Sequence, residues 1–524
     1  MEEFAPHADF VQANASFASW LQAVLVLAQQ NAAELKAAQL KIEALTFELA
    51  YLRRIRFGRT SEAILSSQQS LFGDAIADDA NVIEAETVEQ PTHTQDAKAP
   101  ITRRPRTKPT GRQPLPDNLP RIEHRHELDT CICGQCNQAL VKIGEDVSEQ
   151  LDVEPARFFV HRHIRPQYAC RTCETVVAQP TPPAIIDGGL AAPGLHAWVL
   201  IQKYCDHLPL YRIEQICARH GVSIARSTLA EWVGKLGLAL QPLVDRLCKI
   251  LRAQKSMHAD ETPVRQLDPG AGKTKRAYLW AYRSNDLENS PRIVIFNYQN
   301  SRAGQHVQNF LHNWQGHLMV DDYAGYKALF GRNITELACL AHMRRKFFDL
   351  HAANQNTLAA EALQKIGELY AIEHDAKDKD AHTRLQIRQT HALPKVRELR
   401  DWLLITRTSV AEGGGMAKAI DYSLKRWNAF ERYLTCGTLP IDNNPLENAI
   451  RPIAIGKKNW LFVGSETAGE HAAAIQSLVA TAKLNDIDPY AWLKDTLEKL
   501  PTWPNAKIDE LLPLRRKSSN IDSS

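Results

Sequence analysis

The stretches Ser256-Met-His-Ala-Asp260 and Gly316-His-Leu-Met-Val-Asp321 decide the fold that we expect, because each is a short apolar run that ends in an aspartate. Short apolar runs of this length are typical of buried strands. Around them the sequence predicts a helix near Ser301–Trp314 and further strands at Ala277–Tyr282, Arg292–Phe296 and Thr335–Cys339.

The order of these elements predicts a mixed α/β sheet. Three consecutive strands, then a helix and another strand, are the order of a ribonuclease-H-like fold. In such a fold the first and fourth strands lie side by side, so Asp260 and Asp321 should converge at one end of the sheet. Carboxylates that lie so close repel each other unless a cation sits between them.

A third acidic residue lies in Asp442-Asn-Asn-Pro-Leu-Glu447-Asn-Ala-Ile-Arg451. Asn443 or Asn444 can cap a helix there, and Pro445 suits its first turn. The charged, helical stretch before it, residues 351–435, predicts an insertion in the core. Two carboxylates at strand ends and one on a helix can hold a pair of Mg²⁺ ions, the arrangement that supports phosphoryl displacement.

Composition limits the class of protein. The chain has 524 residues, enough for several domains, and 63 basic and 60 acidic residues leave a net charge of +3, which says nothing about partners. No apolar run approaches the roughly 20 residues of a membrane span, and the N-terminus does not resemble a secretory signal. Two close cysteine pairs suit metal binding in a reducing cytosol. We therefore expect a cytoplasmic protein with no membrane contact.

Residues 18–57 predict one long amphipathic helix. Its apolar residues repeat every seven positions, which is the pattern of a coiled coil: Leu21, Ala28, Leu35, Ile42 and Leu49. Self-association through this helix is one interpretation, and an ordinary helix packed on its own domain is the other.

Residues 62–118 predict a flexible linker, because an acidic block is followed by a basic one without hydrophobic periodicity. Its basic end is typical of an extended arm in the minor groove of DNA, although a solvated linker fits equally well. The DNA contacts in this arm would be Arg103, Arg104, Arg106 and Arg112.

Residues 119–185 predict a zinc module. Two Cys-x-x-Cys pairs can place four thiolates tetrahedrally around one structural Zn²⁺, and reduced cysteines without metal are the alternative. The alternating stretch Ala156–His163 predicts a strand hairpin that bridges the two pairs. The expected ligands are Cys133, Cys136, Cys170 and Cys173, with Cys131 as a substitute.

Residues 188–254 predict helices with helix-turn-helix spacing: Leu210–His220, a turn at Gly221–Ser223, and a second helix from Ile224. Residues at the start of such a second helix contact bases or phosphates, which makes Arg226, Ser227 and Thr228 candidates. A plain helical hairpin in a core is the alternative.

Together these motifs resemble the DDE transposases of the insertion-sequence-66 family, over about residues 20–500. The chain has Asp322 where the family commonly has Gly, so Asp322 stays an alternative to Asp321, whereas Glu261 should point away from Asp260 on its strand. The matching stretches are Gly111–Pro116, Gly144–Gln150, Ala259–Pro263, Asp321–Tyr326, Cys339–Phe347 and Asn443–Pro452.

The resemblance implies a mechanism. Asp260, Asp321 and Glu447 would hold two Mg²⁺ ions, with Mn²⁺ as the alternative ion. Water would cut the end of a mobile element, and the freed 3′-hydroxyl would attack target DNA without a covalent protein intermediate. The implied partners are the terminal inverted repeats, the target DNA, a second copy of the chain or more, and small accessory proteins of the same element, at the bacterial nucleoid.

Further DNA contacts are expected near the carboxylates. After the fifth strand come three residues that can contact the scissile phosphate: His342, Arg344 and Arg345. A solvated start of a helix is the alternative. Cys339 and His342 can instead form half of a second metal site. The helix that carries Glu447 offers cations and an aromatic ring for a splayed DNA end, although the ring can equally be core: Arg451, Lys457, Lys458 and Trp460.

Two rival functions remain, a zinc-containing DNA-binding regulator and a nuclease that cuts without joining. The presence of all three acids argues against the regulator.

The expected division of the chain is a coiled coil at 18–57, a linker at 62–118, a zinc module at 119–185, a helical domain at 188–254, catalytic core at 255–350 and 436–500, an insertion at 351–435 and a tail at 501–524.

Overall fold

The computed structural model describes residues 183–515 apart from 269 and 332, together with residues 157–164, 167–169, 176–178 and scattered positions between 22 and 41. By its internal contacts the chain divides into two compact units, Asn81–Arg162 and the rest. All described helices and strands belong to the second unit.

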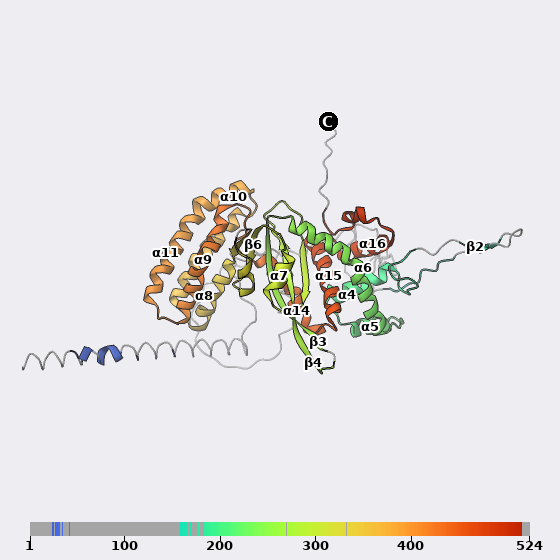
Figure 1. The fold of residues 1–524 in the computed structure, drawn as a ribbon, viewed down its shortest axis with the longest axis horizontal. Helices are drawn as coiled ribbons and strands as arrows, with labels where there is room; N and C mark the ends of the chain where they lie inside the picture. Colours follow the sequence, from blue (N-terminus) through green and yellow to red (C-terminus); the bar gives the residue numbers. More distant parts are fainter. Residues whose placement is uncertain are drawn as a thin grey trace, which may run out of the picture. The chain divides into compact units, whose positions relative to one another are not determined.

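A five-stranded mixed sheet forms the core of this unit (Figure 1). Its strands β5-β4-β3-β6-β7, in spatial order, pair antiparallel from β5 to β3 and parallel from β3 to β7. The five strands that the sequence predicts are therefore present, and the first and fourth are neighbours as expected. Their bounds are β3 Ser256–Asp268, β4 Lys273–Ser284, β5 Val294–Gln299, β6 Gly316–Val320 and β7 Ile334–Ala338.

Strand β3 is longer than predicted. We expected it to close at Asp260, but it pairs with β4 as far as Asp268, opposite Lys273. Its second half alternates buried and exposed residues, a half-buried strand pattern that an apolar run does not reveal. On β3, only Ser256–His258 pair with the neighbouring strand β6. Asp260 therefore lies just beyond the last pair with β6, in the middle of β3.

Helices α14 (Asn444–Trp460) and α15 (Glu466–Leu484) cover one face of the sheet. Leu446, Ile450 and Ile453 of α14 pack with apolar side chains of β3, β4 and β5. The other face packs against α7 (Gly304–Phe310) and the 3₁₀ helix η1 (Ala324–Leu329), where the ring of Tyr282 stacks on Phe310 at 3.6 Å between centroids.

The edge strand β5 is protected by hydroxyl groups of α15. The Ser477 hydroxyl accepts a hydrogen bond from the backbone N–H of Phe296 at 2.8 Å, and the Thr481 hydroxyl accepts one from Val294 at 3.1 Å. An edge strand otherwise presents unpaired N–H groups to any other strand. Serine and threonine four residues apart lie on one face of a helix, so α15 satisfies two of these groups.

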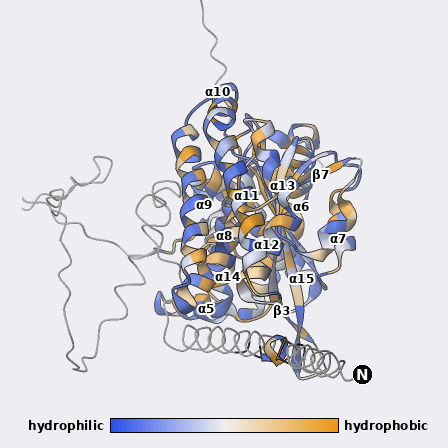
Figure 2. Ribbon diagram, turned by 90° about the vertical axis from the view of Figure 1, so that its left-hand side faces the viewer, coloured by the Kyte–Doolittle hydropathy of each residue, from blue (hydrophilic) through white to orange (hydrophobic). Residues whose placement is uncertain are grey.

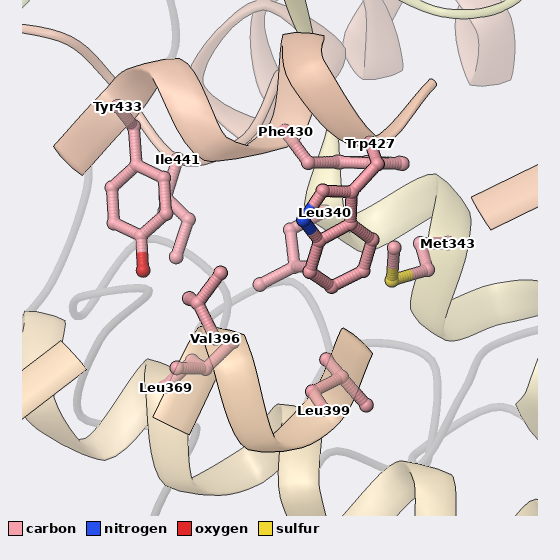
Figure 3. A pocket seen from close by; sticks show the side chains of 9 residues that line it. All are labelled: Leu340, Met343, Leu369, Val396, Leu399, Trp427, Phe430, Tyr433 and Ile441. Carbon is pink, nitrogen blue, oxygen red and sulfur yellow. The ribbon is translucent and has the colours of Figure 1, made fainter. Parts of the chain in front are cut away.

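A helical segment, α8–α13, lies between β7 and α14 and carries both hydrophobic and hydrophilic residues along its helices (Figure 2). Its apolar core includes Leu340, Leu369, Val396 and Trp427, whose side chains line a small cavity (Figure 3). The helices are α8 Leu340–Asn354, α9 Thr357–Ala376, α10 Ala381–Ile387, α11 Leu393–Ser409, α12 Gly415–Lys425 and α13 Trp427–Glu431, with a π-helical turn at Arg388–Ala392.

Arg426 anchors this helical segment to the sheet. Its buried guanidinium donates hydrogen bonds to the backbone oxygens of Val320 and Asp321, at 3.3 and 3.0 Å, and to Glu336 Oε1 at 2.7 Å. The end of β6, where Asp321 lies, is therefore fixed by a side chain from the helical segment.

The N-terminal helices pack on the C-terminal part of the chain. Helix α4 (Pro193–Tyr204) contacts α16 (Pro489–Lys499), and α6 (Arg226–Arg252) runs along α15. In Figure 1 these helices and α5 (Leu210–Arg219) lie to the right of the sheet, and α8–α11 lie to its left, beyond β6. The ion pair between Arg246 and Asp509 joins α6 to η5 (Asn505–Leu511).

The hairpin expected at Ala156–His163 is wrong, because residues 157–164 contain no strand. The apolar side chains of Phe159 and Val160 are 75% and 91% exposed, so alternation here does not produce a buried sheet face. Instead β1 (Gln167–Ala169) and β2 (Val176–Ala178) pair antiparallel on either side of residues 170–175.

Two further observations complete the fold. The described positions between 22 and 41 are helical and exposed, and pairing of this helix with a second copy stays a prediction. Within the described residues, no helix has the length and apolarity needed to cross a membrane.

Candidate active site

Asp260 is the most perturbed carboxylate of the site. Burial raises its pKa well above the usual value, and the negative charges of Glu261, Asp321 and Glu447 raise it further. Its Oδ1 accepts a hydrogen bond from the backbone N–H of Glu261 at 2.8 Å, which partly offsets this effect. The structure therefore brings the charges of Asp321 and Glu447 within reach of Asp260.

The two aspartates after β6 have different partners. Asp321 follows the last residue of β6, and its Oδ1 accepts a hydrogen bond from Tyr323 N at 2.9 Å. Asp322 instead forms ion pairs with Lys327 at 2.8 Å and with Arg426 at 3.6 Å. Burial acts to raise the pKa of Asp322, but these cations outweigh burial and hold the pKa below its usual value. Of these two aspartates, Asp321 is the one whose charge raises the pKa of Asp260.

Glu261 is committed to other partners, although it is the direct neighbour of Asp260. Its side chain is 1% exposed and forms an ion pair with Arg302 at 2.5 Å. It also accepts a hydrogen bond from the Tyr326 hydroxyl at 2.8 Å. Burial raises the pKa of Glu261, and these two partners oppose the rise.

Glu447 lies in the first turn of α14, with Pro445 at the start of the helix as predicted. Its Oε1 lies 3.6 Å from Nδ1 of His342, in the first turn of α8. Neither atom has a hydrogen-bond partner among the described residues, although both atoms are buried. Cys339 completes this group, because its sulfur, a ring nitrogen of His342 and a carboxylate oxygen of Glu447 all lie within 4.8 Å of one another.

Asn443 positions the start of α14, in a way that the sequence did not predict. It occupies the N-cap position, but its side chain does not cap the helix. Its Oδ1 accepts a hydrogen bond from His258 Nδ1 at 2.9 Å, and its Nδ2 donates to Ala259 O at 3.2 Å. Its backbone N–H donates to the Cys339 sulfur at 3.1 Å. One buried amide thus links α14 to β3, directly before Asp260.

Two buried groups beside this amide have shifted pKa values. Burial, with the charge of Arg283, lowers the pKa of His258 to about 4, so its ring is neutral. Burial raises the pKa of Asp442 to about 6, against the hydrogen bonds that Tyr370 and Asn444 N donate to it. Both residues lie in stretches that stand out in the sequence, but their pKa shifts depend on elements far apart in the chain and could not be predicted from those stretches.

The predicted DNA contacts on α14 divide into two groups. Arg451 and Lys458 are exposed. Lys457 is half-buried and donates to the backbone oxygen of Pro263 at 2.9 Å, which occupies its ammonium group. Trp460 packs against the apolar core between α14 and the sheet, so the core interpretation of this ring fits the structure better.

The other described DNA-contact candidates lie at helix starts. Arg226 begins α6, is exposed, and pairs with Glu214 at 3.4 Å. Ser227 beside it is exposed, and Thr228 is half-buried. On α8, Arg345 is exposed, whereas Arg344 is half-buried with its guanidinium near the ring of Phe348.

Several predicted site residues lie outside the described residues. They are the arm residues Arg103, Arg104, Arg106 and Arg112 and the cysteines Cys131, Cys133, Cys136, Cys170 and Cys173.

The carboxylate group fits divalent cations. Carboxylate oxygens are the ligands that Mg²⁺ prefers, and a cation among Asp260, Asp321 and Glu447 would offset the repulsion that raises the pKa of Asp260. The arrangement can therefore support metal-assisted chemistry on phosphate esters.

Family comparisons cover most of the chain. The family described as "Transposase IS66 family" matches residues 188–471, and the "IS66 C-terminal element" matches residues 477–514. The "zinc-finger binding domain of transposase IS66" matches residues 130–174, a range that contains all five predicted cysteines. Residues 44–123 match "Transposase C of IS166 homeodomain".

Full-length relatives occur in Sinorhizobium fredii. The uncharacterized protein y4jD is 35% identical over 487 residues, which are 90% of this chain and 94% of the relative. The uncharacterized protein y4qI is 36% identical over 521 residues, which are 95% of this chain and 94% of the relative.

Proposed function

Since the chain belongs to the IS66 transposase family, we propose that it cuts DNA at the ends of its element and joins those ends to target DNA. The residues proposed for catalysis are Asp260, Asp321 and Glu447. The observation that carries this proposal is that Asp321 and Glu447, from elements far apart in the chain, lie close enough to Asp260 for their charges to add to the rise in its pKa that burial causes. A DNA-binding regulator has no need for such a group.

The sheet order supports a ribonuclease-H-like core. Strand β3, the first core strand along the chain, lies in the middle of the sheet. It pairs antiparallel with β4 on one side and parallel with β6 on the other, and the sequence predicted that β3 and β6 are neighbours. In this arrangement Asp260 lies on β3 and Asp321 directly follows the neighbouring β6, and α14, which carries Glu447, packs on the same face of the sheet.

We assign two Mg²⁺ ions, or Mn²⁺, to these carboxylates. When bound, the ions would stabilise negative charge on the attacking and leaving oxygens of the phosphate. The protein itself holds the ligands in place: Arg426 fixes the backbone at Asp321, and Asn443 fixes the helix of Glu447. Asp321 is the proposed second ligand, because Lys327 and Arg426 already neutralise Asp322.

The remaining parts of the chain would bind and hold DNA. We propose one structural Zn²⁺ on Cys133, Cys136, Cys170 and Cys173, in the range that matches the zinc-finger family. Exposed Arg226, Ser227 and Arg345 are proposed DNA contacts. The N-terminal helix would join two copies of the chain, so that two DNA ends can be held together at the nucleoid.

The test is strand cleavage and strand transfer with Mg²⁺ on DNA that carries the element's ends. Wild type should give nicked and joined products. Asp260→Asn, Asp321→Asn and Glu447→Gln should each lower the yield of both products by at least about a thousandfold, while they still bind the same DNA.

A matched control is Asp421→Asn, which removes an exposed carboxylate that pairs with Arg407 in the helical segment. This variant should keep wild-type yields. Nicks without joined strands from wild type would identify a nuclease, and DNA binding without any product would favour a regulator. Equal products from wild type and Glu447→Gln would refute the assignment of the third ligand.

A further inference from the structure

Three donor atoms of different chemical types meet beside the proposed catalytic carboxylates. The Cys339 sulfur, a ring nitrogen of His342 and a carboxylate oxygen of Glu447 all lie within 4.8 Å of one another. They come from the end of β7, the first turn of α8 and the first turn of α14. Cys339 and His342 form a Cys-x-x-His pair, and the structure adds the third ligand, which the sequence did not indicate.

The distance between the nitrogen and oxygen donors suits a tetrahedral cation, and the sulfur lies within 4.8 Å of both. Bonds of about 2.1 Å to nitrogen and oxygen, at tetrahedral angles, separate those two donors by about 3.4 Å. His342 Nδ1 and Glu447 Oε1 are 3.6 Å apart, too far for a good hydrogen bond, and both atoms are buried without a partner among the described residues. A shared cation explains why two buried polar atoms face each other without bonding.

Burial and the charges of Asp442 and Glu447 raise the pKa of the Cys339 thiol well above its usual value, and two backbone N–H donors oppose this rise. The backbone N–H of Asn443 donates to the Cys339 sulfur at 3.1 Å, and the backbone N–H of His342 donates to it as well. Such donors stabilise a thiolate ligand and fix its direction. Cys339 is fully buried, so no other reaction partner reaches it from solvent.

We propose that Cys339, His342 and Glu447 form a second metal site, which binds Zn²⁺ in preference to Mg²⁺ and leaves a fourth position open. Thiolate and imidazole ligands select zinc, whereas Mg²⁺ requires oxygen ligands in octahedral geometry. Binding releases the thiol proton to solvent, because the sulfur coordinates as a thiolate. His342 and Glu447 are 30% and 31% exposed, which gives the ion a path to the site.

The position of Glu447 couples this site to catalysis, a consequence that rests on the proposed function. Glu447 would serve both the Zn²⁺ and the Mg²⁺ ions. Zinc bound to Cys339 and His342 holds its carboxylate on the α8 side and thereby lowers the occupancy of the catalytic ions. We expect zinc to inhibit cleavage when Mg²⁺ is limiting.

Metal binding is tested on the full-length chain, after its zinc module has been loaded with Zn²⁺. Adding Co²⁺ should produce the near-ultraviolet band of cobalt bound to a thiolate, with one cobalt ion more per chain than in Cys339→Ala. His342→Ala should also lose this band, and it serves as the second variant should Cys339→Ala fail to fold. Loss of a residue that supports a metal ligand typically weakens metal binding by about 10–100-fold. Loss of a ligand itself should weaken zinc binding by more than this.

Two controls separate this proposal from the proposed function. Cys436→Ala removes a half-buried thiol outside the group and should keep the cobalt band. Asp260→Asn should keep the band and lose strand cleavage, since Asp260 is not among the three donors. Equal cobalt spectra and equal zinc content in wild type, Cys339→Ala and His342→Ala would overturn the proposal, whatever the activity of the chain.

Activity provides a separate test of the coupling. Each variant is compared with its own rate without added zinc, at a limiting Mg²⁺ concentration. Wild type and Cys436→Ala should lose about tenfold in cleavage rate on addition of zinc, and saturating Mg²⁺ should restore the rate. Equal sensitivity to zinc in Cys339→Ala would refute the coupling and leave the metal-binding result to stand on its own.

Discussion

At the scale of single residues, Asn443 links the proposed ligands on different elements. Its amide bonds His258 and Ala259 on β3, and its N–H bonds Cys339 at the end of β7. Since Asp260 follows Ala259 and Glu447 lies one turn beyond Asn443, this one side chain sets the distance between two of the three acids.

Replacing Asn443 with Ala should therefore lower both stability and activity. The change leaves His258 Nδ1 and the Ala259 carbonyl unsatisfied in the interior, at a cost of about 1–3 kcal/mol for each group. Urea unfolding measures this loss in the free energy of unfolding. Asn444→Ala is the matched control, because the half-buried Asn444 amide donates to Asp442 within the same turn, at 2.7 Å, and bonds no other side chain in the described part of the chain. Equal losses in the two variants would contradict the role of Asn443.

The neighbouring aspartates after β6 offer a second prediction. Asp321→Asn should abolish cleavage, whereas Asp322→Asn should keep most of it, because Lys327 and Arg426 retain Glu336 as a partner at 3.1 and 2.7 Å. Cleavage rates measured against Mg²⁺ concentration check this difference. A greater loss in Asp322→Asn than in Asp321→Asn would exchange the two assignments.

Sequence could indicate the acids of the site but not the contacts that position them. Asp260, Asp321 and Glu447 stand out because each lies next to a strand or helix signal. Asn443 also has a local signal, and that signal predicts a helix cap, yet the amide bonds β3 instead. Long-range packing overrides a local preference, and the expected strand order predicts that Asp260 and Asp321 converge but not which amide from another segment meets them.

At the scale of elements, the pairing of β5 with α15 yields a third prediction. Ser477→Ala and Thr481→Val should each leave a buried N–H of β5 without its acceptor, at a cost of about 1–3 kcal/mol in the free energy of unfolding. Thr408→Val is the control, because the Thr408 hydroxyl is exposed and bonds Ile405 O in its own helix. Its effect should stay within about 0.5 kcal/mol. Equal effects of Thr408→Val and Thr481→Val would contradict the protective role of α15.

Elements with strong local patterns could be predicted, and elements defined by their partners could not. The five core strands appear where apolar runs predict them. The second half of β3, Pro263–Asp268, was missed. It pairs with β4, but its residues do not form an apolar run that would predict a strand. The stretch Ala156–His163 shows the opposite error. Its alternation of apolar and polar residues predicts a strand hairpin, but residues 157–164 contain no strand.

At the scale of the whole molecule, segments that the sequence separates pack together. We expected the helices of 188–254 to form their own domain, yet α4 packs on α16 and α6 packs on α15, near the C-terminal end of the chain. Charge and composition mark linkers well, but they do not show which helices share a core. The buried face of α6, which includes Trp232, Leu236 and Leu240, serves that shared core.

His196 makes the stability of this core dependent on pH. Its ring lies on α4 against Trp232 of α6, at 5.2 Å between centroids, and burial lowers its pKa to about 4 from the usual 6.5. A depressed pKa stabilises the folded chain above pH 6.5, and this stabilisation is lost as the pH falls from 6.5 towards 4, because the unfolded chain binds the proton first. The loss from this residue should reach about 2 kcal/mol at pH 5.

His196→Phe keeps an aromatic ring against Trp232 and cannot bind a proton. The fall in the free energy of unfolding between pH 7 and pH 5 should therefore be about 2 kcal/mol smaller in this variant than in wild type. Part of the fall should remain, because the pKa of the fully buried His258 is also about 4 and acts in the same direction. Urea unfolding at the two pH values measures the difference. An unchanged fall would contradict the depressed pKa of His196 and would leave His258 and other groups to account for the pH dependence.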